Sequence, residues 1–203
     1  FSSDAFLKIK KAMKKASAIL IGCGLGVNND TASILVDVIR NAEVPLIIDA
    51  DGINIISHNI NVLKAAKVPI ILTPHPGEMS RLTGKTVQQI QADRIQTAVD
   101  FARDYNVTLV LKGANTVVAT PYETPYVNTT GNPGMSKGGS GDLLAGVIAA
   151  FTAVGMSPEK ASVLAVYIHG LAGDIAAEKY SMTGMTPTDA ANCLPFALST
   201  IEK

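Results

Sequence analysis

Short runs of apolar residues alternate along this chain with longer stretches in which apolar positions recur every three or four residues. The short runs are rich in Ile, Leu and Val and lack strict alternation, which is typical of parallel strands buried on both faces. They predict strands at 18–22, 45–50, 69–73 and 108–113. Two further segments, 116–120 and 123–128, flank a turn at Pro121 and predict an antiparallel pair.

The longer stretches have the spacing of helices whose apolar stripes pack into a core. They predict helices over 29–40, 86–104, 157–179 and 186–201, with another around 144–151. Asn29 or Asp30 is expected to cap the first of these helices. Strands that alternate with helices predict one α/β domain with a mostly parallel central sheet and helices on both faces.

Composition narrows the possible partners of this domain. The chain has 203 residues, of which 47% are hydrophobic and 17% charged, so disorder is excluded. Basic and acidic residues both number 17, which argues against nucleic acid or an anionic membrane as partner. The two cysteines, Cys23 and Cys193, are far apart and lack metal-ligand spacing, as expected of reduced thiols in a cytoplasmic protein.

The loops after the strands are the candidate sites, because ligands in open α/β folds bind beyond the carboxyl ends of the strands. The first loop, GCGLG at 22–26, lets the backbone approach a ligand closely or serves only as a strand-to-helix turn. Its glycines alternate and miss the G-x-G-x-x-G pattern, which disfavours a Rossmann dehydrogenase.

The second and third loops carry acids and a histidine. Asp49 and Asp51, directly after a buried strand, lie near a metal or phosphate, or else Asp51 caps the following helix. His75 is held between two prolines in TPHPGEM and is either a ligand contact or a surface turn residue. His58 is interpreted as a surface residue and His169 as a core or lining residue.

The fourth loop, LKGANT at 111–116, places a lysine at the end of a buried strand. Lys112 offers a point charge to a phosphate, and Gly113, Asn115 and Thr116 offer contacts to adenine or ribose. The alternative is a plain β-turn that joins two strands.

The segment GGSGD at 138–142 lies where a helix must begin. The first backbone amides of a helix have no partner inside it, and glycines leave room for a phosphate to settle on them. Asp142 would repel a resting phosphate, so its useful role is to take the proton of an attacking hydroxyl. The alternative is an ordinary first-turn helix acid. The chain has no Walker P-loop, and GGSGD is not a nucleophile elbow.

These motifs in order, together with NPGMSKGG and YIHGLAGDIAAEK, resemble the ADP/ATP-dependent NAD(P)H-hydrate dehydratases of the ribokinase-like superfamily. The resemblance runs from about 19 to 198 and implies a ribokinase-like fold. It also implies a repair reaction in which the C6 hydroxyl of hydrated NADH or NADPH is phosphorylated by ADP or ATP. Loss of phosphate then restores the double bond.

The resemblance also implies residue roles. Asp142 matches the base, and the anion hole matches Gly139, Ser140 and Gly141. The nucleotide-binding positions are Lys112, Gly113, Ala114, Asn115, Thr116 and Gly141. The positions that contact the hydrated dinucleotide are Gly24, Gly26, His75 and Asp142. Mg²⁺ is expected to bridge the nucleotide phosphates, with water-mediated contacts from Asp49, Asp51 or Glu78.

The chain departs from the family pattern in two respects. It is expected to lack the N-terminal segment that precedes the part matching Phe1, and it has Ser136–Lys137 where Ala–Thr is commoner, so Lys137 is expected to add positive charge near the phosphates. The family commonly assembles, which implies a homo-oligomer. Two alternative functions stay open: a kinase of a hydroxymethyl or hydroxyethyl vitamin precursor, and a nucleotide-binding module without catalysis.

Overall fold

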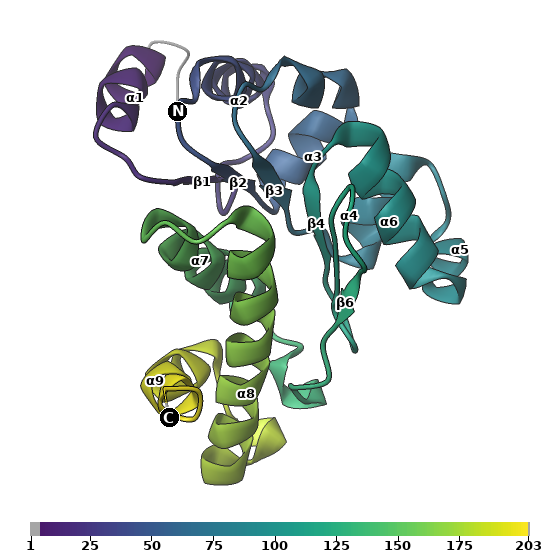
Figure 1. The fold of residues 1–203 in the computed structure, drawn as a ribbon, viewed down its shortest axis with the longest axis vertical. Helices are drawn as coiled ribbons and strands as arrows, with labels where there is room; N and C mark the ends of the chain where they lie inside the picture. Colours follow the sequence, from purple (N-terminus) through teal and green to yellow (C-terminus); the bar gives the residue numbers. More distant parts are fainter. Residues whose placement is uncertain (1–4, 203) are drawn as a thin grey trace.

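A computed structural model describes residues 5–202, which form a central sheet between two layers of helices (Figure 1). Within the described residues the sheet has six strands in the order β1-β2-β3-β4-β5-β6. The strands are β1 (Ile19–Ile21), β2 (Leu46–Ile48), β3 (Ile70–Leu72), β4 (Thr108–Leu111), β5 (Val117–Ala119) and β6 (Tyr126–Val127). The first four are parallel and the last two antiparallel, as the sequence predicted.

One face of the sheet is covered by helices from the first half of the chain. These are α1 (Ala5–Met13), α2 (Asn29–Asn41), α3 (Asp51–Ser57), α4 (Pro76–Thr83), α5 (Val87–Ala92) and α6 (Arg94–Tyr105), with the 3₁₀ helix η1 (Ile60–Ala65). Strand residues such as Leu46, Ile48 and Leu72 point into this layer and form the larger core cluster with α2, α3 and α6. These strand residues are fully buried because parallel strands covered on both faces have no side that faces solvent.

The other face is covered by α7 (Ser140–Ala153) and α8 (Pro158–Gly184) (Figure 1). The alternate strand residues Ile47, Ile71 and Val110 point into this second layer. The helix α9 (Pro187–Ser199) packs on α8 and forms a third cluster with it. Helices therefore lie on both faces, which confirms the predicted α/β architecture.

Several predicted boundaries were wrong in detail. The predicted helix 86–104 is divided at Asp93, which leaves helical geometry and caps α6 by accepting from the Gln96 amide. Asn28, rather than Asn29 or Asp30, caps α2 by accepting from the Thr31 amide. The run at 18–22 was expected to be wholly buried, but β1 is only partly buried because it lies at the sheet edge.

The segment 130–135, with the 3₁₀ helix η2 (Pro133–Met135), packs directly against α8. Two glycines of α8 make this approach possible. A Cβ on Gly170 would come within 2.2 Å of Thr130 Oγ1, and one on Gly173 within 2.2 Å of Met135 Sδ. The backbone before the GGSGD segment is thus held against the surface of α8.

Gly170→Ala is expected to destabilise the protein by about 1–3 kcal/mol, because the new methyl group would also overlap the Thr130 backbone. The matched control is Gly146→Ala in α7, where an added Cβ meets nothing within 4 Å. That change is expected to stabilise by up to about 1 kcal/mol through helix propensity. Urea unfolding measures the change in stability of both variants. Equal changes would contradict the close packing of Gly170 against Thr130.

Among the helices of the described part of the chain, none has the length and hydropathy that crossing a membrane requires.

Candidate active site

The turns that follow β1 and β2 are packed against each other at the carboxyl end of the sheet. Gly22 has φ of 127°, and a Cβ there would lie 1.9 Å from the Asp49 carbonyl oxygen, so only glycine fits. The Gly26 amide donates to Asp51 Oδ2 at 2.8 Å. Asp51 therefore ties the two turns together and does not cap α3, whose cap residue Ala50 makes no side-chain cap bond. Gly24 and Gly26 have open space around them.

A buried charge cluster lies beside these turns. Lys112 Nζ, from the end of β4, is 2.7 Å from Asp49 Oδ1 and 3.7 Å from Glu78 Oε2. The Asp49 side chain is 1% exposed and the Lys112 side chain 17%. Because parallel strands end at one edge of the sheet, residues far apart in sequence meet here. The structure thus brings together three of the candidate residues.

His75 acts as the N-cap of α4. Its Nδ1 accepts from the amides of Gly77 and Glu78, at 2.9 and 3.2 Å. Glu78 closes a capping box, since its Oε2 accepts from the His75 amide at 2.7 Å. The side chain of His75 remains half exposed, although its Nε2 lies 3.5 Å from Glu78 Oε1.

The N-terminus of α7 offers free backbone donors. Gly139 caps the helix with φ of 95°, and the Ser140 amide donates to the Lys137 carbonyl at 3.2 Å. Across residues 5–202, no hydrogen bond to protein is formed by the amides of Gly138, Gly139, Gly141 and Asp142. A Cβ on Gly141 would lie 3.3 Å from Lys112 Nζ. The free amides and the lysine ammonium therefore converge on one place, which favours an anion there.

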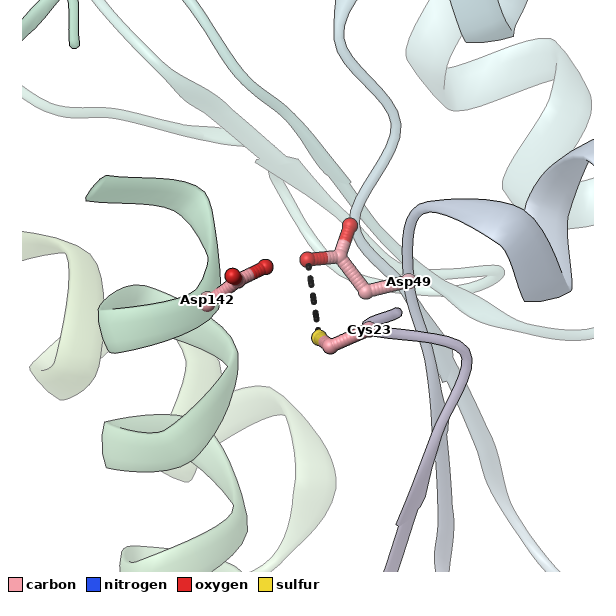
Figure 2. A group of neighbouring side chains, drawn as sticks. All are labelled: Cys23, Asp49 and Asp142. Carbon is pink, nitrogen blue, oxygen red and sulfur yellow. Dashed lines mark hydrogen bonds between the residues drawn. The ribbon is translucent and has the colours of Figure 1, made fainter. Parts of the chain in front are cut away.

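Asp142 points from α7 toward Asp49 and Cys23 (Figure 2). Carboxylate oxygens of the two acids and Cys23 Sγ all lie within 4.8 Å of one another. Asp142 is solvent-exposed, whereas Asp49 is buried. The exposed carboxylate thus stands at the mouth of the charged cluster, beside the free amides of its own helix.

Cys23 is the residue of this cluster that sequence reasoning missed. Its thiol lies 3.8 Å from Asp49 Oδ2, which accepts the S–H. Burial, and then the negative charges of Asp49 and Asp142, raise the pKa of Cys23 to about 12. The signal in the sequence was its position inside GCGLG rather than any spacing to other ligands.

Cys23 is therefore expected to react slowly with iodoacetamide, because the thiolate is the reactive form. At about pH 8 and without metal or nucleotide, alkylation should be at least about a hundredfold slower than that of an unstructured thiol. Asp142→Asn removes one of the negative charges that raise the pKa, and so should speed the reaction. Peptide mapping by mass spectrometry over a pH series separates Cys23 from Cys193. Unchanged reactivity in the variant would contradict the coupling.

The predicted nucleotide segment lies next to the cluster. Gly113 and Asn115 have positive φ values, and Thr116 Oγ1 donates to the Gly113 carbonyl at 3.0 Å. Arg94, not singled out from sequence, donates from Nη2 to the carbonyls of Leu111 and Lys112 at 2.9 and 3.3 Å. These bonds fix the backbone that carries the lysine.

Lys137 takes a different position from the expected one. Its ammonium donates to the carbonyls of Thr183, at 2.8 Å, and Met185 near the end of α8. Those carbonyls lie beyond the break at Ser181, where φ is 66°. The expectation of added charge at the phosphates is wrong in this structure, because the side chain ties the loop to the α8–α9 turn.

The donor groups of the cluster suit a hard cation only in part. Mg²⁺ prefers oxygen ligands and retained water, which fits the carboxylates of Asp49 and Asp142 but not the Cys23 thiol. Glu78 and Asp51, the other expected contacts, have oxygens engaged by backbone amides. The Asp49 oxygens likewise accept from Lys112 and Cys23, so the exposed carboxylate of Asp142 is the better fit.

The sheet order and the layers of helices define a ribokinase-like α/β fold. A ribokinase-like superfamily protein from Enterococcus faecalis matches the chain with a TM-score of 0.84 and 30% identity, over 98% of this chain and 69% of that one. This likeness confirms the predicted fold class.

The chain belongs to the NAD(P)H-hydrate dehydratase family, whose model matches residues 2–195. The bifunctional NAD(P)H-hydrate repair enzyme of Thermofilum pendens is 42% identical over 97% of the chain. The chain spans only 37% of the length of that relative. The crystal structure of the ADP/ATP-dependent NAD(P)H-hydrate dehydratase from Bacillus subtilis, co-crystallised with ATP/Mg²⁺, matches with a TM-score of 0.82 and 32% identity, covering 95% of this chain and 70% of that one.

Proposed function

We propose that this chain is one catalytic domain that dehydrates C6-hydrated NADH and NADPH with ADP or ATP as phosphoryl donor. Family membership supports this function over that of a vitamin-precursor kinase. The observation that carries the proposal is the meeting of free α7 amides, Lys112 and Asp142 at one point. Phosphoryl transfer needs positioning and charge stabilisation, and this arrangement supplies both.

Asp142 takes the proton from the C6 hydroxyl as the hydroxyl oxygen attacks the terminal phosphorus of the nucleotide. The amides of Gly139 and Gly141 and the hydroxyl of Ser140 stabilise the charge on the transferring group. The bond to the nucleotide's bridging oxygen breaks, and the nucleotide leaves one phosphate shorter. The phosphate ester then loses phosphate and a ring proton, which restores the double bond.

The remaining candidates hold the two substrates. The segment Lys112–Thr116, with Gly141, contacts the nucleotide, and its backbone is fixed by Arg94. The open turn at Gly24 and Gly26 and the exposed edge of His75 contact the hydrated dinucleotide. Mg²⁺, held near Asp49 and Asp142, would neutralise the nucleotide phosphates.

The test is incubation of the protein with hydrated NADH and either ADP or ATP. Recovery of the absorbance of reduced nicotinamide, dependent on nucleotide and accompanied by release of inorganic phosphate, is expected. A stable phosphorylated product from hydroxyethylthiazole or hydroxymethylpyrimidine, without recovery of NADH, would instead indicate the kinase. Binding of ADP in calorimetry without any turnover would indicate the nucleotide-binding module.

We extend the proposal to a cytoplasmic location and a homo-oligomer. The two free thiols, Cys23 and Cys193, suit a reducing compartment. Size-exclusion chromatography with light scattering measures the assembly, and a monomer at micromolar concentration would contradict it.

A further inference from the structure

His169 on α8 lies behind the anion-binding end of α7. Its Nε2 is 3.5 Å from Ser140 Oγ, and the residue is only 8% exposed. Burial lowers the pKa of His169 to about 4, so the imidazole is neutral at neutral pH. A neutral imidazole has one N–H, and which nitrogen carries it determines what Ser140 presents to a ligand.

The two tautomers give opposite results at Ser140. If Nε2 has no proton, the Ser140 hydroxyl donates to it and turns only lone pairs toward the α7 N-terminus. If Nε2 carries the proton, it donates to Ser140 Oγ and leaves the hydroxyl proton for an anion. Ser140 Oγ has no other hydrogen-bond partner within residues 5–202. An anion on the free amides of α7 therefore favours the second arrangement.

We propose that His169 is a positioning residue that donates its Nε2 proton to Ser140 Oγ and thereby directs the Ser140 hydroxyl proton to the terminal phosphate of the nucleotide. This inference rests on the proposed function and adds to it the residue that orients the Ser140 hydroxyl. His169 does not contact the phosphate; it acts through Ser140.

The surroundings hold His169 in place relative to the loop. One turn further along α8, Asp174 accepts from the Gly131 amide at 2.8 Å and from Asn132 Nδ2 at 2.9 Å. Between these two side chains, Gly170 and Gly173 let the loop backbone rest directly on the helix. This stretch of α8 therefore anchors the segment 131–140 at Gly131 through Asp174, and His169 lies beside Ser140 at the other end.

The test is calorimetric titration of ADP and AMP into wild type, Ser140→Ala, His169→Phe and the double variant. AMP lacks the terminal phosphate and serves as the internal reference. Each single variant is expected to bind ADP about tenfold more weakly, the typical loss of one hydrogen bond to a charged group. The double variant should be no weaker than Ser140→Ala alone, and AMP affinity should be unchanged throughout.

His169→Gln keeps an N–H donor and should recover most of the ADP affinity. Ser162→Ala is the control for α8, because Ser162 is also buried but bonds only the Pro158 carbonyl at the other end of the helix. Two results would overturn the positioning role. One is a loss of ADP affinity in the double variant equal to the sum of the two single losses, and the other is a loss of AMP affinity as large as that of ADP affinity. Absence of ADP binding by wild type would overturn the proposed function itself, and this inference with it. Thermal unfolding of each variant identifies any that fails to fold. In that case the ADP affinity of His169→Gln decides whether His169 has the positioning role.

Discussion

Asp142→Asn is expected to lower turnover of hydrated NADH by about a thousandfold while ADP binding stays close to that of wild type. The amide has the same shape as the carboxylate but accepts no proton, and general-base catalysis is worth about 10²–10⁴ in rate. The free amides and Lys112, which we propose as the phosphate-binding groups, are untouched by this change. Removal of a negative charge beside the phosphate also means that nucleotide affinity should not fall.

Initial rates with saturating ADP measure the loss of turnover, and calorimetry with ADP measures binding. The matched control is Glu159→Gln, which neutralises another first-turn helix acid, in α8. If both variants lose rate equally, the effect of Asp142 is one of helix electrostatics. If Asp142→Asn turns over at the wild-type rate, Asp142 is not the base.

Lys112→Met is expected to cost both stability and activity. Asp49 and Glu78 would be left buried without the cation that faces them, and loss of one partner of a buried ion pair costs about 3–5 kcal/mol. Activity should fall as well, because the ammonium lies 3.3 Å from where a Cβ on Gly141 would be, beside the proposed phosphate position. Methionine preserves the length of the apolar stem, so the lost charge is the main change.

Urea unfolding at neutral pH measures the stability, with Lys67→Met, an exposed lysine, as the control expected to be neutral. The double variant Lys112→Met/Asp49→Asn should recover part of the stability, because it removes a buried carboxylate along with the cation. It should not recover activity, since the ammonium is still missing. A double variant as unstable as the single one would show that Asp49 is not what Lys112 stabilises.

Much of the fold could be predicted from the local sequence. Buried runs such as 45–50 and 69–73 became the parallel strands β2 and β3, since strands covered on both faces are apolar along their whole length. The order of strands and helices then placed the loops after the four parallel strands at one edge of the sheet. The expected helix 86–104 was wrong in its interior, because Asp93 forms an N-cap that the apolar spacing does not reveal.

The candidate site divides in the same way. Residues in one loop, such as Gly139–Asp142 or His75 with Glu78, have geometry that follows from helix capping and was accessible from sequence. Contacts between residues of different loops could not be predicted from the sequence. Cys23 lies against Asp49 from 26 positions away, and Arg94 holds the Leu111 carbonyl from a helix that no motif marked.

The sequence by itself determined the α/β class, the loops that bear chemistry and the glycine-rich start of α7, because these depend on hydrophobic spacing and on local backbone geometry. Only the tertiary structure decided that Lys112 pairs with Asp49 across 63 positions, that Lys137 ties the loop to α8, and that His169 stands behind Ser140. The physical reason is that such contacts are set by how the layers pack on the sheet, and packing depends on the whole chain at once.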